Sequence, residues 1–194
     1  MNDDVKPDPA IACDITLNTA LTTDERRRFQ SVPTIRRILR ESRTIAVVGL
    51  SNERQKASHF VATYLQRAGY RVIPVNPRGG TVLGETVYPD LASVPVPLDL
   101  VVIFRRGQDS MRMAEQAIAA RVPRIWFQLR IPAKEAAERA AAAGLEVVID
   151  KCIKMEHGRF GGTLAWGGMN TEIVSAKKAS NPCRKPGSGR PVRD

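Results

Sequence analysis

The feature that most constrains the fold is a series of short apolar runs that alternate with stretches of helical periodicity. The runs cover residues 44–48, 71–75, 98–104, 124–128 and 146–149. Strands that are buried on both faces of a sheet read as nearly continuous apolar runs of this length. Helices between successive strands are typical of βαβ crossovers, which pair the strands in parallel. We therefore predict a single α/β domain, doubly wound around a mainly parallel sheet of about five strands.

Helical periodicity covers the segments between these runs and a stretch before the first of them. The predicted crossover helices span residues 55–67, 110–120 and 132–143. One or two further helices fall within residues 24–41, and Pro33 opens the second because proline is tolerated in a first helical turn.

The two ends of the chain differ from its middle. Residues 1–23 have weak periodicity and several turn formers, so we expect a poorly ordered lead-in. We expect the domain itself to span residues 24–178, and residues 179–194 to form a basic, disordered tail.

Composition is that of an ordinary globular protein, with 43% hydrophobic and 26% charged residues. No apolar run approaches the roughly 18 residues of a membrane-spanning helix, and the acidic start is unlike a signal peptide. We expect a cytoplasmic protein without a membrane partner. Cys13, Cys152 and Cys183 form no CxxC pair, so we expect reduced thiols and no zinc or other metal site.

The excess of positive charge raises the question of a polyanionic partner. The net charge is +10 at pH 7, which suits either a polynucleotide or a phosphorylated small molecule. Aromatic residues make up only 5% of the chain, and no helix-turn-helix or RNA-binding signature is present. We therefore rank nucleic acid last among the candidate partners.

The residues after the first predicted strand carry groups suited to an anion. Gly49 lets backbone approach a ligand, and the helix that follows presents unpaired N–H groups. Short polar side chains and a cation are added by Ser51, Asn52, Ser58 and Lys56. Because the second and third glycines of GxGxxG are missing, the turn alone does not indicate a generic dinucleotide site.

The second predicted strand ends at Asn76 and Pro77. NAD-binding domains usually place an acidic residue here to hold the adenine ribose. Its absence argues against NAD, whereas Arg78 leaves NADP open.

The third predicted strand ends in an aromatic residue followed by two arginines, Phe104, Arg105 and Arg106. Two guanidinium groups beside an aromatic ring suit phosphate recognition next to a base or a pantetheine arm.

Six segments in this order resemble the CoA-binding domain family: IAVVGLSNERQKAS, YLQRAGYRVIPVNP, LGETVYPDLASVP, DLVVIFRR, IWFQL and VVIDKCIKMEH. The fold of that family is that of the N-terminal domain of the succinyl-CoA synthetase alpha subunit. The resemblance extends from Pro33 to Lys178.

The resemblance implies a Rossmann-like domain that holds coenzyme A or an acyl-CoA at the first glycine turn. The ligand-binding residues that it implies are Gly49, Leu50, Ser51, Asn52, Lys56, Ser58, Asn76, Pro77, Phe104, Arg105 and Arg106. The family commonly has a glycine after the IWxQ segment, where this chain has Arg130, so the shape of that edge is expected to differ.

Succinyl-CoA synthetase also needs a phosphohistidine from a further domain and an ATP-grasp partner, for which this chain has no room. We therefore expect a carrier, sensor or accessory module without catalysis of its own. The alternatives are an NADP-dependent oxidoreductase and a nucleotide- or nucleic-acid-binding regulator. A homodimer or an unknown protein partner is left open by the glycine-rich segment 161–168.

Four other residues have a structural and a functional interpretation. Trp126 lies within a strand and is expected in the core, and His157 is expected to have a structural or surface role. His59 either contacts the ligand or packs at its helix start. Cys152 is either buried and inert or able to form a mixed disulfide with coenzyme A.

Overall fold

A parallel five-stranded sheet forms the centre of the fold in this computed structural model, which describes residues 21–105 and 109–161. Its strand order is β2-β1-β5-β6-β7. The strands are β1 (Thr44–Val48), β2 (Arg71–Val75), β5 (Leu100–Ile103), β6 (Arg124–Phe127) and β7 (Glu146–Val148). Every pair of neighbours is parallel, which confirms the predicted doubly wound α/β fold.

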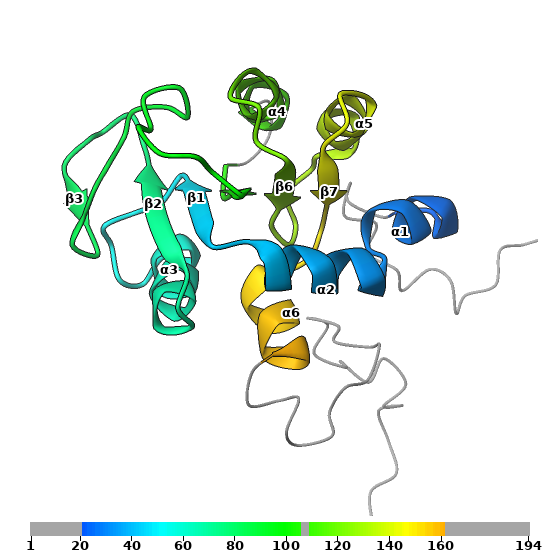
Figure 1. The fold of residues 1–194 in the computed structure, drawn as a ribbon, viewed down its shortest axis with the longest axis horizontal. Helices are drawn as coiled ribbons and strands as arrows, with labels where there is room; N and C mark the ends of the chain where they lie inside the picture. Colours follow the sequence, from blue (N-terminus) through cyan, green and yellow to red (C-terminus); the bar gives the residue numbers. More distant parts are fainter. Residues whose placement is uncertain (1–20, 106–108, 162–194) are drawn as a thin grey trace, which may run out of the picture. The chain divides into compact units, whose positions relative to one another are not determined.

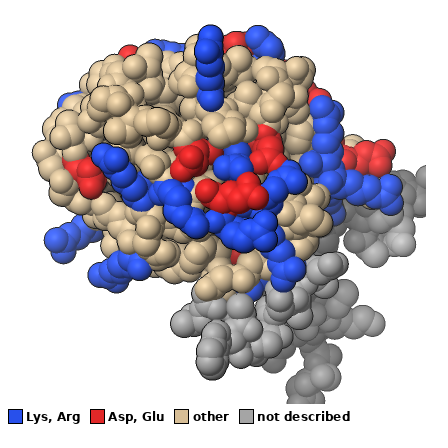
Figure 2. All heavy atoms as spheres, viewed as in Figure 1, with Lys and Arg blue, Asp and Glu red and all other residues tan. Residues whose placement is uncertain are grey.

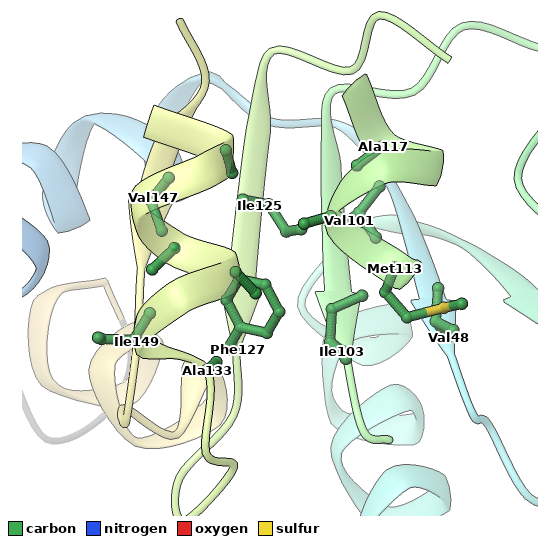
Figure 3. Packing of buried hydrophobic residues seen from close by; sticks show 14 of the residues in the cluster. Val48, Val101, Ile103, Met113, Ala117, Ile125, Phe127, Ala133, Val147 and Ile149 are labelled. Atoms are coloured by element: carbon green, nitrogen blue, oxygen red, sulfur yellow. The ribbon is translucent and has the colours of Figure 1, made fainter. Parts of the chain in front are cut away.

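Helices cover both faces of this sheet, as Figure 1 shows. One face is covered by α2 (Val32–Glu41), α3 (Ala57–Arg67) and α6 (Ile153–Phe160), and the other by α4 (Asp109–Ala119) and α5 (Lys134–Ala142). Alternate residues of each strand serve the two layers: Ala46 packs under α4 and α5, whereas Val47 packs under α2 and α3. In Figure 3, Met113 of α4 lies against Val48 and Ile103 of the strands.

The segment before the sheet contains two helices, as predicted. Helix α1 (Thr23–Phe29) begins with a capping box between Thr22 and Glu25, and α2 carries Pro33 in its first turn. Leu21 and Phe29 are buried in the layer that contains α4 and α5, so α1 contributes to the core.

Ion pairs tie α2 to the amino edge of the sheet. Arg124 Nε lies 2.9 Å from Glu146 Oε2, its Nη2 lies 2.6 Å from Glu41 Oε2, and Arg37 pairs with Glu146 as well. Burial alone raises the pKa of the Glu146 carboxyl, but the hydrogen bonds from Arg124 and Arg37 outweigh it and hold that pKa below its ordinary value. Figure 2, viewed from the same side as Figure 1, shows acidic and basic side chains lying next to one another in the middle of the molecule.

Two parts of the structure were not predicted. Strands β3 (Thr81–Val82) and β4 (Glu85–Thr86) form an antiparallel ribbon around a turn in which Leu83 and Gly84 both have positive φ. Strands of two residues are too short to show periodicity. Helix α6 was also missed, because its eight residues include four charged residues or histidines and a glycine.

Several predictions concern segments outside the described residues. They include most of the lead-in, the basic tail, and all but the first residue of the segment 161–168. Among the helices that the structure describes, none is long and apolar enough to cross a membrane.

The predicted structural role of His157 is confirmed. Its Nδ1 is hydrogen-bonded to the Tyr64 hydroxyl at 2.9 Å, and its ring meets those of Tyr64 and Tyr70 edge-on. Trp126 is fully buried as predicted, and its Nε1 donates to the Lys151 carbonyl at 2.7 Å. Burial lowers the pKa of His157, because the charged ring is poorly solvated there.

The lowered pKa of His157 predicts a loss of stability in mild acid. Between the folded pKa and the ordinary pKa of 6.5, the unfolded chain binds more protons than the folded chain. The free energy of unfolding should therefore fall as the pH drops through 6.5 and stop falling below the folded pKa. Urea unfolding at about pH 7.5 and about pH 5.5 tests this. His157→Gln should weaken the pH dependence, and equal dependences in the two proteins would contradict the assignment.

Two methionines of α4 offer a matched test of its packing. Met113 is 8% exposed and lies in the core, whereas Met111 is 37% exposed. Met113→Ala should lower the free energy of unfolding by about 2–5 kcal/mol, because it leaves a cavity. Met111→Ala should stay within about 0.5 kcal/mol of the parent. Similar losses in both variants, measured by urea unfolding, would mean that α4 packs differently.

Candidate functional site

The turn after β1 brings bare backbone next to an arginine side chain. Gly49 has φ +82°, and its N–H donates to the Val75 carbonyl at 2.9 Å. A β carbon built on Gly49 would lie 3.4 Å from Cγ, Cδ and Nε of Arg105. The guanidinium stem of Arg105 therefore lies across the glycine, which accommodates both the backbone angle and the close approach.

The loop between Gly49 and α3 is held by hydrogen bonds within itself. Ser51 N–H donates to the Ser58 hydroxyl at 3.1 Å, and Glu53 N–H donates to the Ser51 hydroxyl at 3.2 Å. His59 Nδ1 donates to the Ser51 carbonyl at 3.0 Å, so this histidine is a partner of the loop backbone. Ser58 is buried, so its hydroxyl shapes the loop from beneath.

Helix α3 starts at this loop and points its N-terminus toward the carboxyl edge of the sheet. Lys56 is the N-cap, and within the described residues no side chain caps the helix. The N–H groups of the first turn and the helix dipole thus favour an anion. Asn52 and Lys56 are exposed beside them, and the Lys56 ammonium lies 3.7 Å from Glu53.

The turn after β2 is fastened to the turn after β1. Asn76 Nδ2 donates to the Leu50 carbonyl at 2.9 Å, and Arg78 N–H donates to Asn76 Oδ1 at 3.2 Å. Pro77 is exposed next to this amide. The Leu50 side chain is buried in the core under α2 and α3, so only its backbone borders the site.

The turn after β5 faces the turn after β1. Phe104 N–H donates to the Val48 carbonyl at 2.9 Å, and the ring is partly buried against the core. Arg105 is partly exposed, and Arg106 lies outside the described residues. The structure thus brings Arg105 together with the glycine turn predicted to bind phosphate.

The ends of β6 and β7 complete this edge. Arg130 and Asp150 both have positive φ, and Arg130 N–H donates to the Asp150 carboxylate at 2.8 Å. The left-handed angle of Arg130, φ +64°, explains the glycine expected there from the family resemblance, because glycine adopts it without strain. The edge therefore keeps a tight turn despite the arginine.

Asn76 and His59 were named from the sequence, but their roles in holding the loops were not predicted. The Asn76 amide binds the Leu50 carbonyl and so joins the turns after β1 and β2. The His59 imidazole binds the carbonyl of Ser51 in the loop after β1. No sequence signal distinguishes these roles from ligand contact, because the same polar groups serve either. Gln128, the residue after β6, was not a candidate from the sequence, and its buried side chain accepts the Ile153 N–H.

One groove in the described structure lies away from these loops. It has a volume of about 440 Å³ and runs between residues 90–98 and the C-terminal part of α4. Among the described residues, its lining is mainly apolar and includes no arginine or lysine, so it lacks groups for a phosphate. In the described ranges, no three histidine, cysteine or acidic side chains converge as metal ligands.

Comparison with known proteins agrees with this geometry. The protein YneT of Bacillus subtilis, called uncharacterized, is 37% identical over 123 residues, which is 63% of this chain and 91% of that protein. A hypothetical protein from Pyrococcus horikoshii is 35% identical with a TM-score of 0.65, covering 67% of this chain and 92% of that one.

A structure from Thermus thermophilus is 33% identical with a TM-score of 0.64 and covers 67% of this chain and 98% of that one. Residues 43–158 match the family described as the CoA binding domain. The matched range contains the glycine turn, the Asn76 turn and Arg105. This chain belongs to the CoA-binding domain family.

Proposed function

We propose that this domain binds coenzyme A or an acyl-CoA at the turn after β1, as a carrier, sensor or accessory module that catalyses no reaction itself. The observation that carries the proposal is the contact between Gly49 and Arg105 beside the uncapped start of α3. Backbone N–H groups, a helix dipole and a guanidinium are complementary to a diphosphate. Membership of the family supports coenzyme A as the source of that diphosphate.

The turn after β2 favours coenzyme A over NAD. Asn76 directly follows β2. At the corresponding position, NAD-binding domains have a carboxylate that binds the ribose hydroxyls of the adenosine. Coenzyme A carries a phosphate on the 3′ oxygen, which a carboxylate would repel. Arg78 is exposed two residues further on and supplies a positive charge for such a phosphate.

The hydrogen bonds of the loops support binding rather than catalysis. The hydroxyls of Ser51 and Ser58 accept backbone N–H groups, and the Asn76 amide is used on both its nitrogen and its oxygen. These groups hold the loop shape, so it needs little reordering when a ligand binds. A preorganised loop whose hydroxyls are engaged by its own backbone suits a module that holds a cofactor.

Alanine variants of two glycines with nearly the same φ can distinguish the effect of backbone strain on stability from an effect on ligand binding. Gly49 has φ +82° and faces Arg105, whereas Gly84 has φ +80° and no described atom within 4 Å of the position that a methyl group would take. Both alanine variants should lose similar stability, because both strain the backbone. Only Gly49→Ala should also weaken coenzyme A binding, by about tenfold or more, because its methyl, in contact with the Arg105 stem, covers the backbone that the diphosphate would approach.

Isothermal titration of both variants with coenzyme A, 3′-dephospho-CoA, NADP and ADP makes this measurement. We expect the parent protein to prefer coenzyme A and to lose affinity when the 3′-phosphate is removed. Binding of NADP without coenzyme A, or equal affinities of the two glycine variants, would contradict the proposal.

Removal of the guanidinium tests the phosphate contact directly. Arg105→Ala should weaken coenzyme A binding by about 10–100-fold, the usual value of a charged hydrogen bond. Arg71→Ala is the control. Arg71 is an exposed arginine at the amino end of β2, and the proposed site lies at the carboxyl ends of the strands. The loss should shrink at high salt, since salt screens exposed charges. Equal affinities of the two arginine variants would remove Arg105 from the site.

A further inference from the structure

Cys152 lies at the same edge of the sheet as the proposed coenzyme A site. It follows β7 and is the N-cap of α6. Trp126 Nε1 of β6 donates to the carbonyl of Lys151 at 2.7 Å, and Ile153 N–H donates to Gln128 Oε1, also of the β6 end, at 3.4 Å. These two hydrogen bonds fix the residues on either side of Cys152 to the end of β6. Cys152 therefore lies next to the carboxyl end of β6, although it follows β7 in the chain.

A buried amide next to this cysteine has an unused donor. Gln128 is 4% exposed, and its Nε2 has no hydrogen-bond partner among the described residues. Buried donors in folded proteins are nearly always paired, and an acceptor carried by a ligand would pair this one. The pantetheine arm of coenzyme A carries two amide carbonyls, which are acceptors of the required kind.

The Cys152 thiol is accessible from the carboxyl edge of the sheet. The residue is partly exposed, and the described ranges contain no second cysteine. Lys154 follows it in the first turn of α6, with its ammonium 4.1 Å from the centre of the Phe60 ring on α3. Glu156, the nearest acid on α6, is occupied by Lys151 and Arg159. A thiol must be partly exposed to react, and Cys152 keeps this exposure although it also packs against the core under α2 and α3.

The distance between the two sites matches the length of the ligand. Strand β6 lies two places from β1, which at the usual strand spacing is about 10 Å. The pantetheine arm has about as many chain atoms as four residues and extends to about 13 Å. A coenzyme A held by its diphosphate at Gly49 can therefore bring its sulfur to Cys152.

We propose that Cys152 captures coenzyme A covalently by thiol–disulfide exchange with coenzyme A disulfide. The Cys152 thiolate attacks one sulfur of the disulfide and forms a new S–S bond to it. The old S–S bond breaks, and the second coenzyme A leaves as a thiolate with the electron pair. One disulfide replaces another, so no further oxidant is needed. This inference rests on the proposed function, because the nucleotide must bind first.

Exposure of the full-length protein to coenzyme A disulfide and, separately, to glutathione disulfide tests the proposal. Intact mass and peptide mapping measure the adduct at each cysteine, and reductant should reverse it. Prior binding raises the effective concentration, so Cys152 should react with coenzyme A disulfide at least about tenfold faster than with glutathione disulfide. ADP should compete, and Cys152→Ser should abolish the adduct. The double variant Cys13→Ser, Cys183→Ser should retain it.

The outcomes separate this inference from the proposed function. If coenzyme A binds in titration but Cys152 gains no adduct, or reacts equally with both disulfides, the capture inference is wrong and the binding proposal stands. If coenzyme A does not bind at all, both fail. The comparison of two disulfides uses the unaltered protein, so it does not depend on the folding of a variant.

Discussion

The candidate site depends on the path of the chain around β1. After β2 forms on one side of β1, the chain crosses back and places β5 on the other side. The helix after β1 lies on one face of the sheet and the helix after β5 on the opposite face. The two loops therefore diverge at the carboxyl edge, and backbone is left open between them where a ligand can approach.

Hydrogen bonds within the loops keep this opening in shape. The Asn76 amide spans the turns after β1 and β2, and the Ser58 hydroxyl supports Ser51 from beneath. Because these polar side chains are engaged by the loop backbone, they are not the groups that a ligand would bind first. Under the proposed function, the ligand would meet backbone N–H groups, the helix terminus and the cationic side chains of Lys56, Arg78 and Arg105, all of which favour phosphate.

The sequence was sufficient for the parts of the fold that depend on burial. Strands β1 and β2 have the predicted bounds, because both faces are buried and nearly every residue is apolar. The site could be placed after strand ends, since parallel strands bring those ends to one edge. The contact of Arg105 with Gly49 could not be predicted, because a side-chain direction depends on neighbours from distant segments. The pairing of Asn76 with Leu50 was hidden for the same reason.

Three of the strand exits at this edge share one backbone feature. Gly49, Arg130 and Asp150 follow β1, β6 and β7 with φ of +82°, +64° and +54°. For the non-glycine residues this conformation costs about 1–2 kcal/mol each. The hydrogen bond from Arg130 N–H to the Asp150 carboxylate joins the two strained positions and offsets part of that cost. Strain of this kind persists where the surrounding structure fixes it and tends to cluster at ligand sites. The carboxyl edge of the sheet therefore combines tight turns with open backbone. The Arg105 side chain lies across the turn at Gly49, where glycine adopts the positive φ without strain.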